Sequence, residues 1–253
     1  MTGRTKSALR LTAAVVMLSL LMALAAYLLH ELMYQGRTDD TAPISAIPSY
    51  PLIILDAGHG GEDGGTSAKS GLLEKDVNLD ITLKLSQLLI LGGFEVLLTR
   101  DDDRLLYTDK SQGKLKTQDL RSRYEIAKAH PDSLFVSIHS NSFPDESCGG
   151  LQVYYSPNDM RSREIAGLIQ TAAAEYLQPE NDRVIKKADS KIYLLDRIMT
   201  PAVLVECGFL SNINEAELLA DSGYREKLAA VIYKALCDYI AESTDNASED
   251  ISA

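Results

Sequence analysis

Residues 52–65 read LIILDAGHGGEDGG, and this stretch decides the fold. Its first four residues are all apolar, which is typical of a strand buried on both faces in a parallel sheet. Glycines follow immediately, and they let the backbone turn sharply and approach a ligand closely. His59 lies inside this glycine-rich turn, just beyond the predicted end of the strand. Because ligands bind beyond the carboxyl ends of strands in open parallel sheets, the stretch also predicts where a site lies.

The rest of the chain alternates short apolar runs with longer runs of helical period. Leucines at helical spacing predict a helix over 74–91, which ends at Gly92 and Gly93. Residues 100–118 are polar and predict a loop, and residues 150–155 alternate like an exposed or edge strand. The other predicted strands span 94–98, 134–138, 192–195 and 202–205, and the other predicted helices span 119–129, 162–177, 214–219 and 224–240. This order predicts an α/β fold with a mostly parallel twisted sheet flanked by helices on both faces.

The composition excludes several classes of protein. The 253 residues include 25 Lys and Arg against 36 Asp and Glu, a net charge of −11. A nucleic-acid-binding protein needs a basic surface to replace phosphate counterions, so we expect no nucleic-acid partner. The three cysteines are too few and too scattered for a disulfide scaffold or a cysteine-based zinc site. The length is nevertheless sufficient for a core that folds without cross-links.

The first 33 residues predict export. Three basic residues within positions 1–10 precede an apolar run from 11 to 29, the pattern of a signal peptide or of an uncleaved transmembrane anchor. Either one places the remainder outside the cytoplasm, secreted or membrane-anchored. Without residues 1–33 the chain keeps 22 basic and 35 acidic residues, a net charge of −13. We therefore expect an N-terminal transmembrane or signal helix at 1–33, a linker at 34–50, one folded domain at 51–241 and an acidic disordered tail at 242–253.

Two histidines and two glutamates form the candidate site. His59 and His139 each follow an apolar strand, so their imidazoles can converge on one ion at the same edge of the sheet. Glu74 begins a predicted helix, and Glu206 follows the strand at 202–205, where an unused charge is costly. Two imidazoles and one carboxylate make a catalytic metal site with one open position. One glutamate should complete the ligand set and the other should act as general base, and the pattern leaves open which does which.

Four sequence blocks resemble the signature blocks of zinc-dependent N-acetylmuramoyl-L-alanine amidases of the amidase-3 type. They read LDAGHGGEDGG at 55–65, LLEKDVNLDI at 72–81, FVSIHSNS at 135–142 and LVECGFLSN at 204–212, and the segments EVLLTRDDD (95–103) and LRSRYEIA (120–127) also match. The resemblance covers about residues 52–240, which would make the folded domain the amidase catalytic domain.

This resemblance assigns a role to each candidate residue. It implies that His59, Glu74 and His139 bind one Zn²⁺ and that Glu206 is the catalytic carboxylate. We further expect Asp56 or a backbone carbonyl to orient a ligand imidazole, because metal-bound imidazoles are held by their second nitrogen. We also expect Asn141 to line the cleft.

The implied activity is hydrolysis of the amide bond between the lactyl group of N-acetylmuramic acid and L-alanine of the peptidoglycan stem peptide. The short anchored layout and KTQDLRSR at 116–123 resemble the germination-specific, spore-cortex amidases. That resemblance implies removal of stem peptides during muramic-δ-lactam formation, together with a separate deacetylase. A vegetative or cell-separation amidase is the alternative. The 66 residues between His139 and Glu206 leave no room for a long inhibitory helix, so we expect a site that is open or controlled by an activating protein in trans.

Three other functions compete with this one. A zinc peptidase would trim within stem peptides, whereas an amidase releases them whole. A non-catalytic wall-binding module would need a broken ligand set, and here all four positions are filled. A cysteine hydrolase would use Cys207, but neighbouring strand residues point to opposite faces, so Cys207 and Glu206 should not share a site.

Overall fold

The structure, a computed structural model, describes residues 17, 21, 24, 27, 50–107 and 109–252, with the side chains of 112 and 244–252 left aside. The chain divides into two units, Met1–Ser49 and Tyr50–Ala253. The predicted N-terminal helix and nearly all of the predicted linker fall in the first unit, where only four isolated residues are described, all of them helical. Among the described residues, no helix is long and apolar enough to cross a membrane. The sheet and the helices named below all belong to the second unit.

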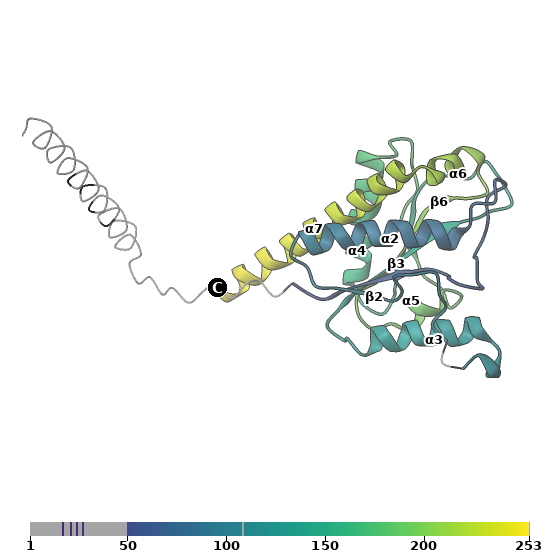
Figure 1. Ribbon diagram of the computed structural model, residues 1–253, viewed down its shortest axis with the longest axis horizontal. Coiled ribbons are helices and arrows are strands. Elements are labelled where there is room, and N and C mark those ends of the chain that lie inside the picture. The colour runs from purple at the N-terminus through teal and green to yellow at the C-terminus, as the bar shows by residue number, and fades with distance from the viewer. Residues whose placement is uncertain are drawn as a thin grey trace, which may run out of the picture. The chain divides into compact units, whose positions relative to one another are not determined.

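Six strands form one sheet in the order β2-β1-β3-β6-β4-β5 (Figure 1). β4 runs antiparallel to β6, and the other neighbouring strands are parallel, which confirms the mostly parallel sheet. The strands are β1 (Ile53–Ala57), β2 (Val96–Leu98), β3 (Leu134–Asn141), β4 (Gln152–Tyr155), β5 (Lys186–Lys187) and β6 (Ala202–Phe209).

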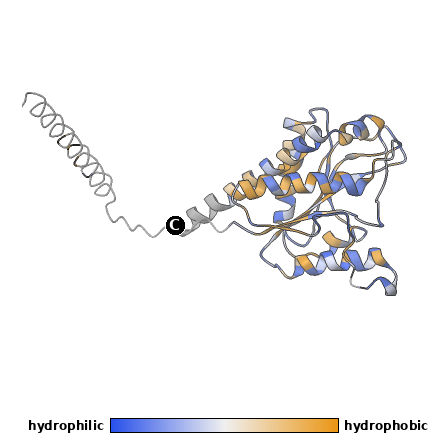
Figure 2. Ribbon diagram, viewed as in Figure 1, coloured by the Kyte–Doolittle hydropathy of each residue, from blue (hydrophilic) through white to orange (hydrophobic). Residues whose placement is uncertain are grey.

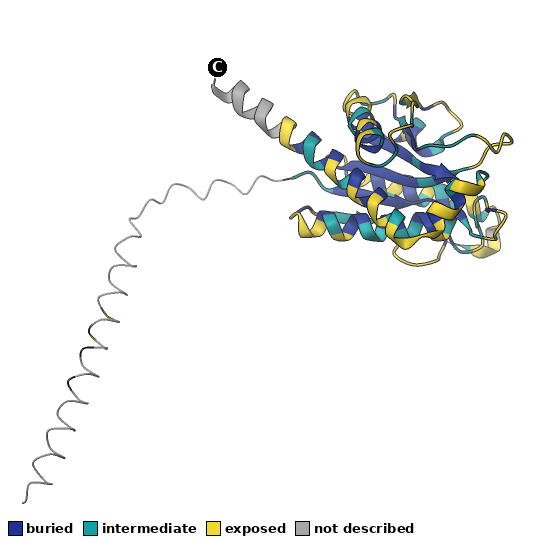
Figure 3. Cartoon of the chain, turned by 90° about the horizontal axis from the view of Figure 1, so that it is seen from above, coloured by how far each residue is buried: buried dark blue, intermediate teal, exposed yellow. Residues whose placement is uncertain are grey.

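Helices cover both faces of this sheet, as predicted. One face packs against α2 (Glu74–Leu91), α4 (Arg161–Tyr176), α6 (Ile213–Ala220) and α7 (Ser222–Ser252), and the other against α3 (Leu115–Lys128) and α5 (Tyr193–Arg197). A short 3₁₀ turn, η1 (Lys110–Gln112), precedes α3. The buried strands lie between the two helical layers (Figure 3). Apolar and polar residues alternate around α2 and α3, so each helix buries one stripe (Figure 2).

β1 shows why the opening stretch decides the fold. All five of its residues are buried, and it pairs in parallel with both β2 and β3. Ile53 and Leu55 belong to the core under α2, while Ile54 belongs to the core under α3 and α5. A strand with two buried faces needs apolar residues at every position, which is the pattern its sequence shows.

Several predicted elements differ from the structure. Residues 192–195 were expected to form a strand, but α5 begins at Tyr193, since an apolar run of four residues does not distinguish a strand from a short helix. The predicted loop at 100–118 contains η1 and the first turn of α3. The strand at 150–155 is not at the edge, because β5 pairs with β4. α7 spans Ser222–Ser252, whereas the predicted helix ends at residue 240.

Candidate active site

His59 occupies the turn after β1 in a left-handed backbone conformation, with φ of 62°. Residues other than glycine rarely adopt this conformation, and where they do, the surrounding structure must hold them in it. Gly60 and Gly61, with φ of 141° and 53°, complete the turn. The glycine-rich sequence is therefore needed to present one imidazole at the carboxyl end of β1.

Arg100 and Arg123 donate hydrogen bonds to the backbone of this turn, and both side chains are almost fully buried. Arg100 donates to the carbonyl oxygens of Ala57 at 2.8 Å and Gly58 at 3.0 Å. Arg123 donates to the carbonyl oxygens of Ala57 and His59, both at 2.7 Å. Three successive carbonyls are thereby fixed by charged donors. Sequence reasoning missed these two arginines, although each lies in one of the segments matched between the four blocks.

Asp56 anchors the same network rather than a histidine. Its carboxylate accepts hydrogen bonds from Thr99 Oγ1 at 2.7 Å and Ser137 Oγ at 2.6 Å and pairs with Arg123. Burial alone would raise the pKa of Asp56, but the Arg123 charge and these hydrogen bonds outweigh it and lower that pKa. None of the hydrogen bonds or ion pairs that Asp56 makes with described residues is to an imidazole.

Asp63, and not Asp56, is the aspartate that contacts a histidine ring. Its Oδ2 lies 2.9 Å from His59 Nδ1, while its Oδ1 accepts the Gly65 backbone N–H at 3.2 Å. A carboxylate on Nδ1 fixes the ring orientation and leaves Nε2 as the free lone pair. Burial would lower the pKa of His59, but its contacts with Glu74 and Asp63 raise it.

Glu74 begins α2 and faces both histidines. Its Oε1 lies 2.9 Å from His139 Nδ1 and 3.2 Å from His59 Nε2, and its Oε2 accepts the Thr66 backbone N–H at 2.9 Å. Burial would raise the pKa of Glu74, but hydrogen bonds and charge from the two imidazoles lower it well below its usual range. Gly65 has φ of 68°, and a Cβ there would overlap the Glu74 carboxylate.

His59, Glu74 and His139 thus form a compact donor group. One nitrogen or oxygen from each lies within 4.8 Å of the other two, and the two rings meet edge to face with centroids 5.1 Å apart. Glu74 Oε1 contacts a nitrogen of each ring. A cation bound between these three atoms can replace the protons that otherwise bridge them. Two imidazoles and a carboxylate suit Zn²⁺, so the residues present fit a zinc ion.

Gly58 makes room for His139. A Cβ at this position would overlap Cε1 and Nε2 of the His139 ring. The same glycine donates its backbone N–H to the Ile138 carbonyl at 3.0 Å, which keeps the turn against β3. Glycine is therefore the residue that lets the turn after β1 and the ring on β3 occupy adjacent space.

Glu206 lies inside β6, directly beside His139. The two are partners in the parallel register between β3 and β6, and a register shift follows between His139 and Asn141. Sequence reasoning expected both residues at strand ends, whereas β3 and β6 continue beyond them. The Glu206 Oε2 atom is buried and has no hydrogen-bond partner among the described residues. Burial, with a smaller contribution from the Glu74 charge, raises the pKa of Glu206 to about 7.

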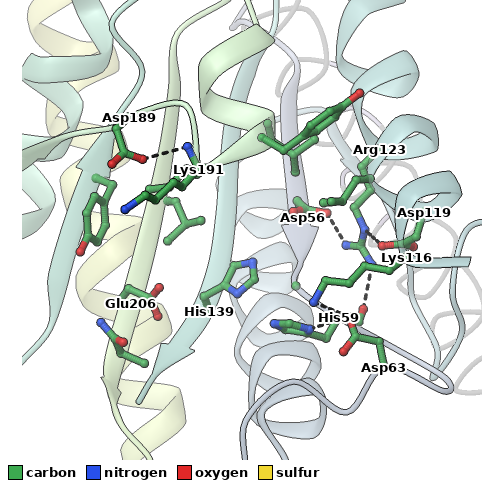
Figure 4. Close-up of a pocket in the computed structure, with 18 of the residues that line it drawn as sticks. Asp56, His59, Asp63, Lys116, Asp119, Arg123, His139, Asp189, Lys191 and Glu206 are labelled. Carbon is green, nitrogen blue, oxygen red and sulfur yellow. Dashed lines mark hydrogen bonds and ion pairs between the residues drawn. The ribbon is translucent and has the colours of Figure 1, made fainter. Parts of the chain in front are cut away.

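A cavity of about 480 Å³ joins these groups on the α3 and α5 side of the sheet (Figure 4). His139 lies between Glu206 on one side and His59 and Asp63 on the other (Figure 4). Asn141 lines the cavity, and so does Asp56. Space for a ligand therefore adjoins both the donor group and Glu206, which has no hydrogen-bond partner in the described part of the chain.

Cys207 is directed away from this cavity. Its side chain is fully buried in the core on the opposite face of the sheet, and burial raises the pKa of the thiol well above its usual range. A thiol that is neither accessible nor ionised cannot act as a nucleophile. This placement removes the cysteine hydrolase from consideration.

Comparison with known protein families gives one match over most of the chain. Residues 53–238 match the family described as N-acetylmuramoyl-L-alanine amidase. The chain is 35% identical over 215 residues to the germination-specific N-acetylmuramoyl-L-alanine amidase of Bacillus subtilis, over 84% of this chain and 90% of that protein.

Solved structures agree with this match. The CwlD amidase of Clostridioides difficile, solved in complex with the GerS lipoprotein, superposes with a TM-score of 0.73 and 40% identity over 76% of this chain and 99% of that one. The N-acetylmuramoyl-L-alanine amidase AmiC2 of Nostoc punctiforme superposes with a TM-score of 0.66 and 30% identity over 76% of this chain and 97% of that one.

Proposed function

This chain belongs to the N-acetylmuramoyl-L-alanine amidase family and acts on peptidoglycan, and we propose that it does so with one Zn²⁺ held by His59, Glu74 and His139 and with Glu206 as general base. The observation that carries the proposal is a compact His-Glu-His donor group beside Glu206, a buried carboxyl without a hydrogen-bond partner among the described residues. His59, His139 and Glu206 line one cavity.

When bound, zinc supplies a Lewis acid that polarises the amide carbonyl and acidifies a water. The protein's own residues do the rest. Glu206, whose pKa is raised to about 7 by burial, accepts the proton of the attacking water and returns it to the departing L-alanine nitrogen. Asp63 keeps the His59 ring in the orientation that directs Nε2 toward the site. The products are a lactyl carboxylate on muramic acid and a free stem peptide.

We place the enzyme outside the cytoplasm, where peptidoglycan lies, with residues 51–241 as catalytic domain and residues 1–33 as signal peptide or anchor. Residues 34–50 would then be the linker, and residues 242–253 an acidic tail. The basic and then apolar N-terminal sequence supports this localisation.

We further propose a role in the spore cortex, in the formation of muramic-δ-lactam. Support comes from the germination-specific relative of Bacillus subtilis and from KTQDLRSR at 116–123. The amidase of Clostridioides difficile was solved with a lipoprotein, which supports control of this chain by a protein in trans. A vegetative or cell-separation amidase is the alternative.

Mass analysis of digests tests the reaction directly. Purified enzyme should release whole stem peptides with a free L-alanine amine and leave glycan with lactyl carboxylates. Peptides shortened from within, on glycan that keeps its L-alanine, would instead identify a zinc peptidase. Parallel digests of cortex and vegetative peptidoglycan compare the two biological roles, and faster release from vegetative material would contradict the cortex assignment.

A further inference from the structure

Two lysines lie along a wall of the catalytic cavity that the zinc chemistry does not use. Lys187 ends β5, and Lys191 lies just before α5, and both side chains line the cavity that contains His139 and Glu206. Figure 4 shows Lys191 and Asp189 on the opposite side of the cavity from His59. Both lysines are exposed, so their ammonium groups are available to a ligand that enters.

The segment that carries these lysines is pinned in place. Ala188 donates its backbone N–H to the Tyr155 carbonyl at 2.9 Å, which ties the segment to β4. Asp189 Oδ1 accepts the Lys191 backbone N–H at 2.9 Å, and the Asp189 carbonyl accepts from Ile192 at 3.1 Å. The backbone that positions the two ammonium groups is thus fixed to the same sheet as Glu206.

Most described lysines pair with a neighbouring acid. These pairs are Lys69–Glu146, Lys75–Asp103, Lys84–Asp80, Lys110–Glu62, Lys116–Asp63, Lys128–Glu125 and Lys234–Asp238. Within the described part of the chain, neither Lys187 nor Lys191 has a carboxylate within 4.0 Å of its ammonium nitrogen. In a protein of net charge −11, two such lysines in one cavity indicate a negatively charged ligand.

The acids of the cavity are largely committed elsewhere. Asp56 and Asp119 pair with Arg123, and Asp63 holds His59 and Lys116. The carboxylate of Asp189 binds backbone. The remaining acid, Glu206, is buried within β6 and is the proposed general base. The charge that balances the two exposed lysines is therefore expected to arrive with the substrate.

We propose that Lys187 and Lys191 form a subsite for a carboxylate of the stem peptide, the free α-carboxylate of the glutamate that follows L-alanine. The inference rests on the proposed amidase function. Two extended residues span at most about 7 Å. When the scissile amide lies at the zinc site, this carboxylate can therefore lie in the same cavity. An ammonium–carboxylate hydrogen bond is charge-assisted, and it selects against an amide in the same position.

A pair of substrates that differ in one group tests the subsite. Muramyl tetrapeptides are prepared with either glutamate or its α-carboxamide in the second position, and kcat/KM is measured for each with the full-length enzyme. Because exposed ion pairs are modest, we expect a preference for the carboxylate on the order of fivefold to tenfold at low salt. The preference should shrink as salt rises.

The variant Lys187→Gln/Lys191→Gln should reduce this preference to about one. The matched control is Lys227→Gln/Lys234→Gln, which removes two charges from α7, outside the cavity, and should keep the wild-type preference. Equal wild-type rates on both substrates would overturn the subsite while leaving the amidase intact. No hydrolysis of either substrate would instead count against the proposed function. Loss of the preference in Lys116→Gln, but not in the double variant, would also overturn the proposal, because the carboxylate would then bind beside Lys116 and Asp63.

Discussion

At the scale of single residues, the two glutamates of the site differ because their surroundings differ. Glu74 Oε1 lies 2.9 Å from His139 Nδ1 and 3.2 Å from His59 Nε2, and Oε2 accepts a backbone N–H. These contacts keep the carboxylate ionised, as its proposed role as a metal ligand requires. Glu206 is buried without a partner among the described residues, which raises its pKa to about 7. A carboxyl near neutral pKa can both accept and return a proton.

Glu206→Gln should therefore abolish turnover while zinc remains bound. The substitution keeps the shape of the side chain and removes the base. His139→Ala should lose both zinc and turnover, because it removes a ligand. Metal content by elemental analysis and peptide release by mass distinguish the two variants. A Glu206→Gln enzyme that still turns over at the wild-type rate would show that another group is the base.

Asp63→Asn should weaken zinc binding by about 10-fold to 100-fold, because the carboxylate that orients His59 is lost. The neighbouring Glu62→Gln is a suitable control, since Glu62 is exposed and pairs with Lys110. Competition with a chromophoric chelator measures both affinities. An unchanged affinity in Asp63→Asn would mean that the ring needs no carboxylate to hold it.

At the scale of elements, the turn after β1 depends on glycine at specific positions. Gly58→Ala should reduce zinc affinity, because the new Cβ overlaps the His139 ring and must displace it. Gly167→Ala, in α4, is the control: no atom lies within 4 Å of its Cβ position, and alanine favours a helix by about 1 kcal/mol. Thermal unfolding and zinc titration are measured for both. Normal zinc binding by Gly58→Ala would show that the ring can move without loss.

The buried pair of Asp56 and Arg123 joins β1 to α3, and its contribution to stability should depend on pH. The folded-state pKa of Asp56 is lowered, so its stabilisation is complete above the unfolded pKa of about 4 and is lost as pH falls below it. Asp56→Asn removes one of the two carboxylates that pair with the buried Arg123, while Asp119 remains, and should cost about 1.5–3 kcal/mol near pH 7.

Denaturant unfolding at pH 7 and at pH 3 checks this expectation. The difference between wild type and Asp56→Asn should shrink at the lower pH. Asp182→Asn, at an exposed position, should change stability by less than about 0.5 kcal/mol. A loss in Asp56→Asn that is equally large at both pH values would contradict the lowered pKa.

The sequence alone was sufficient for the elements that have one clear period. The run at 52–55 predicts a strand because all its residues are apolar, and Glu74 to Leu91 predicts a helix with the observed bounds. The run at 192–195 failed because four apolar residues fit a strand or one helical turn equally well. The ends of β3 and β6 were placed too early, because polar residues of the site interrupt the apolar pattern while the strands continue.

The candidate site was predictable in its donor residues but not in their support. The predicted strand ends and one helix start were enough to select His59, Glu74, His139 and Glu206. In the structure the first three form the donor group, and Glu206 lines the same cavity as the two histidines. The choice of Asp63 over Asp56 as the partner of His59 depends on the fold of the glycine-rich turn, which spacing alone does not give.

At the scale of the whole molecule, the sheet brings distant parts of the sequence to one place. β1, β3 and β6 are adjacent, so His59 in the turn after β1 lies near His139 within β3 and Glu206 within β6. Glu74 is supplied by the first residue of α2. The end of β5 and the segment that follows it place Lys187 and Lys191 on the far side of the cavity. The proposed metal ligands, the proposed base and the proposed lysine subsite therefore lie around one cavity on one sheet.

The most direct test of the central claim follows release of stem peptides from peptidoglycan in one preparation. Release is measured before chelation, after a chelator has removed the metal, and after Zn²⁺ is restored. The proposed site predicts that release stops with the chelator, returns with Zn²⁺, and fails to return in the His139→Ala variant. Undiminished release of whole stem peptides from enzyme shown to be free of metal would contradict it.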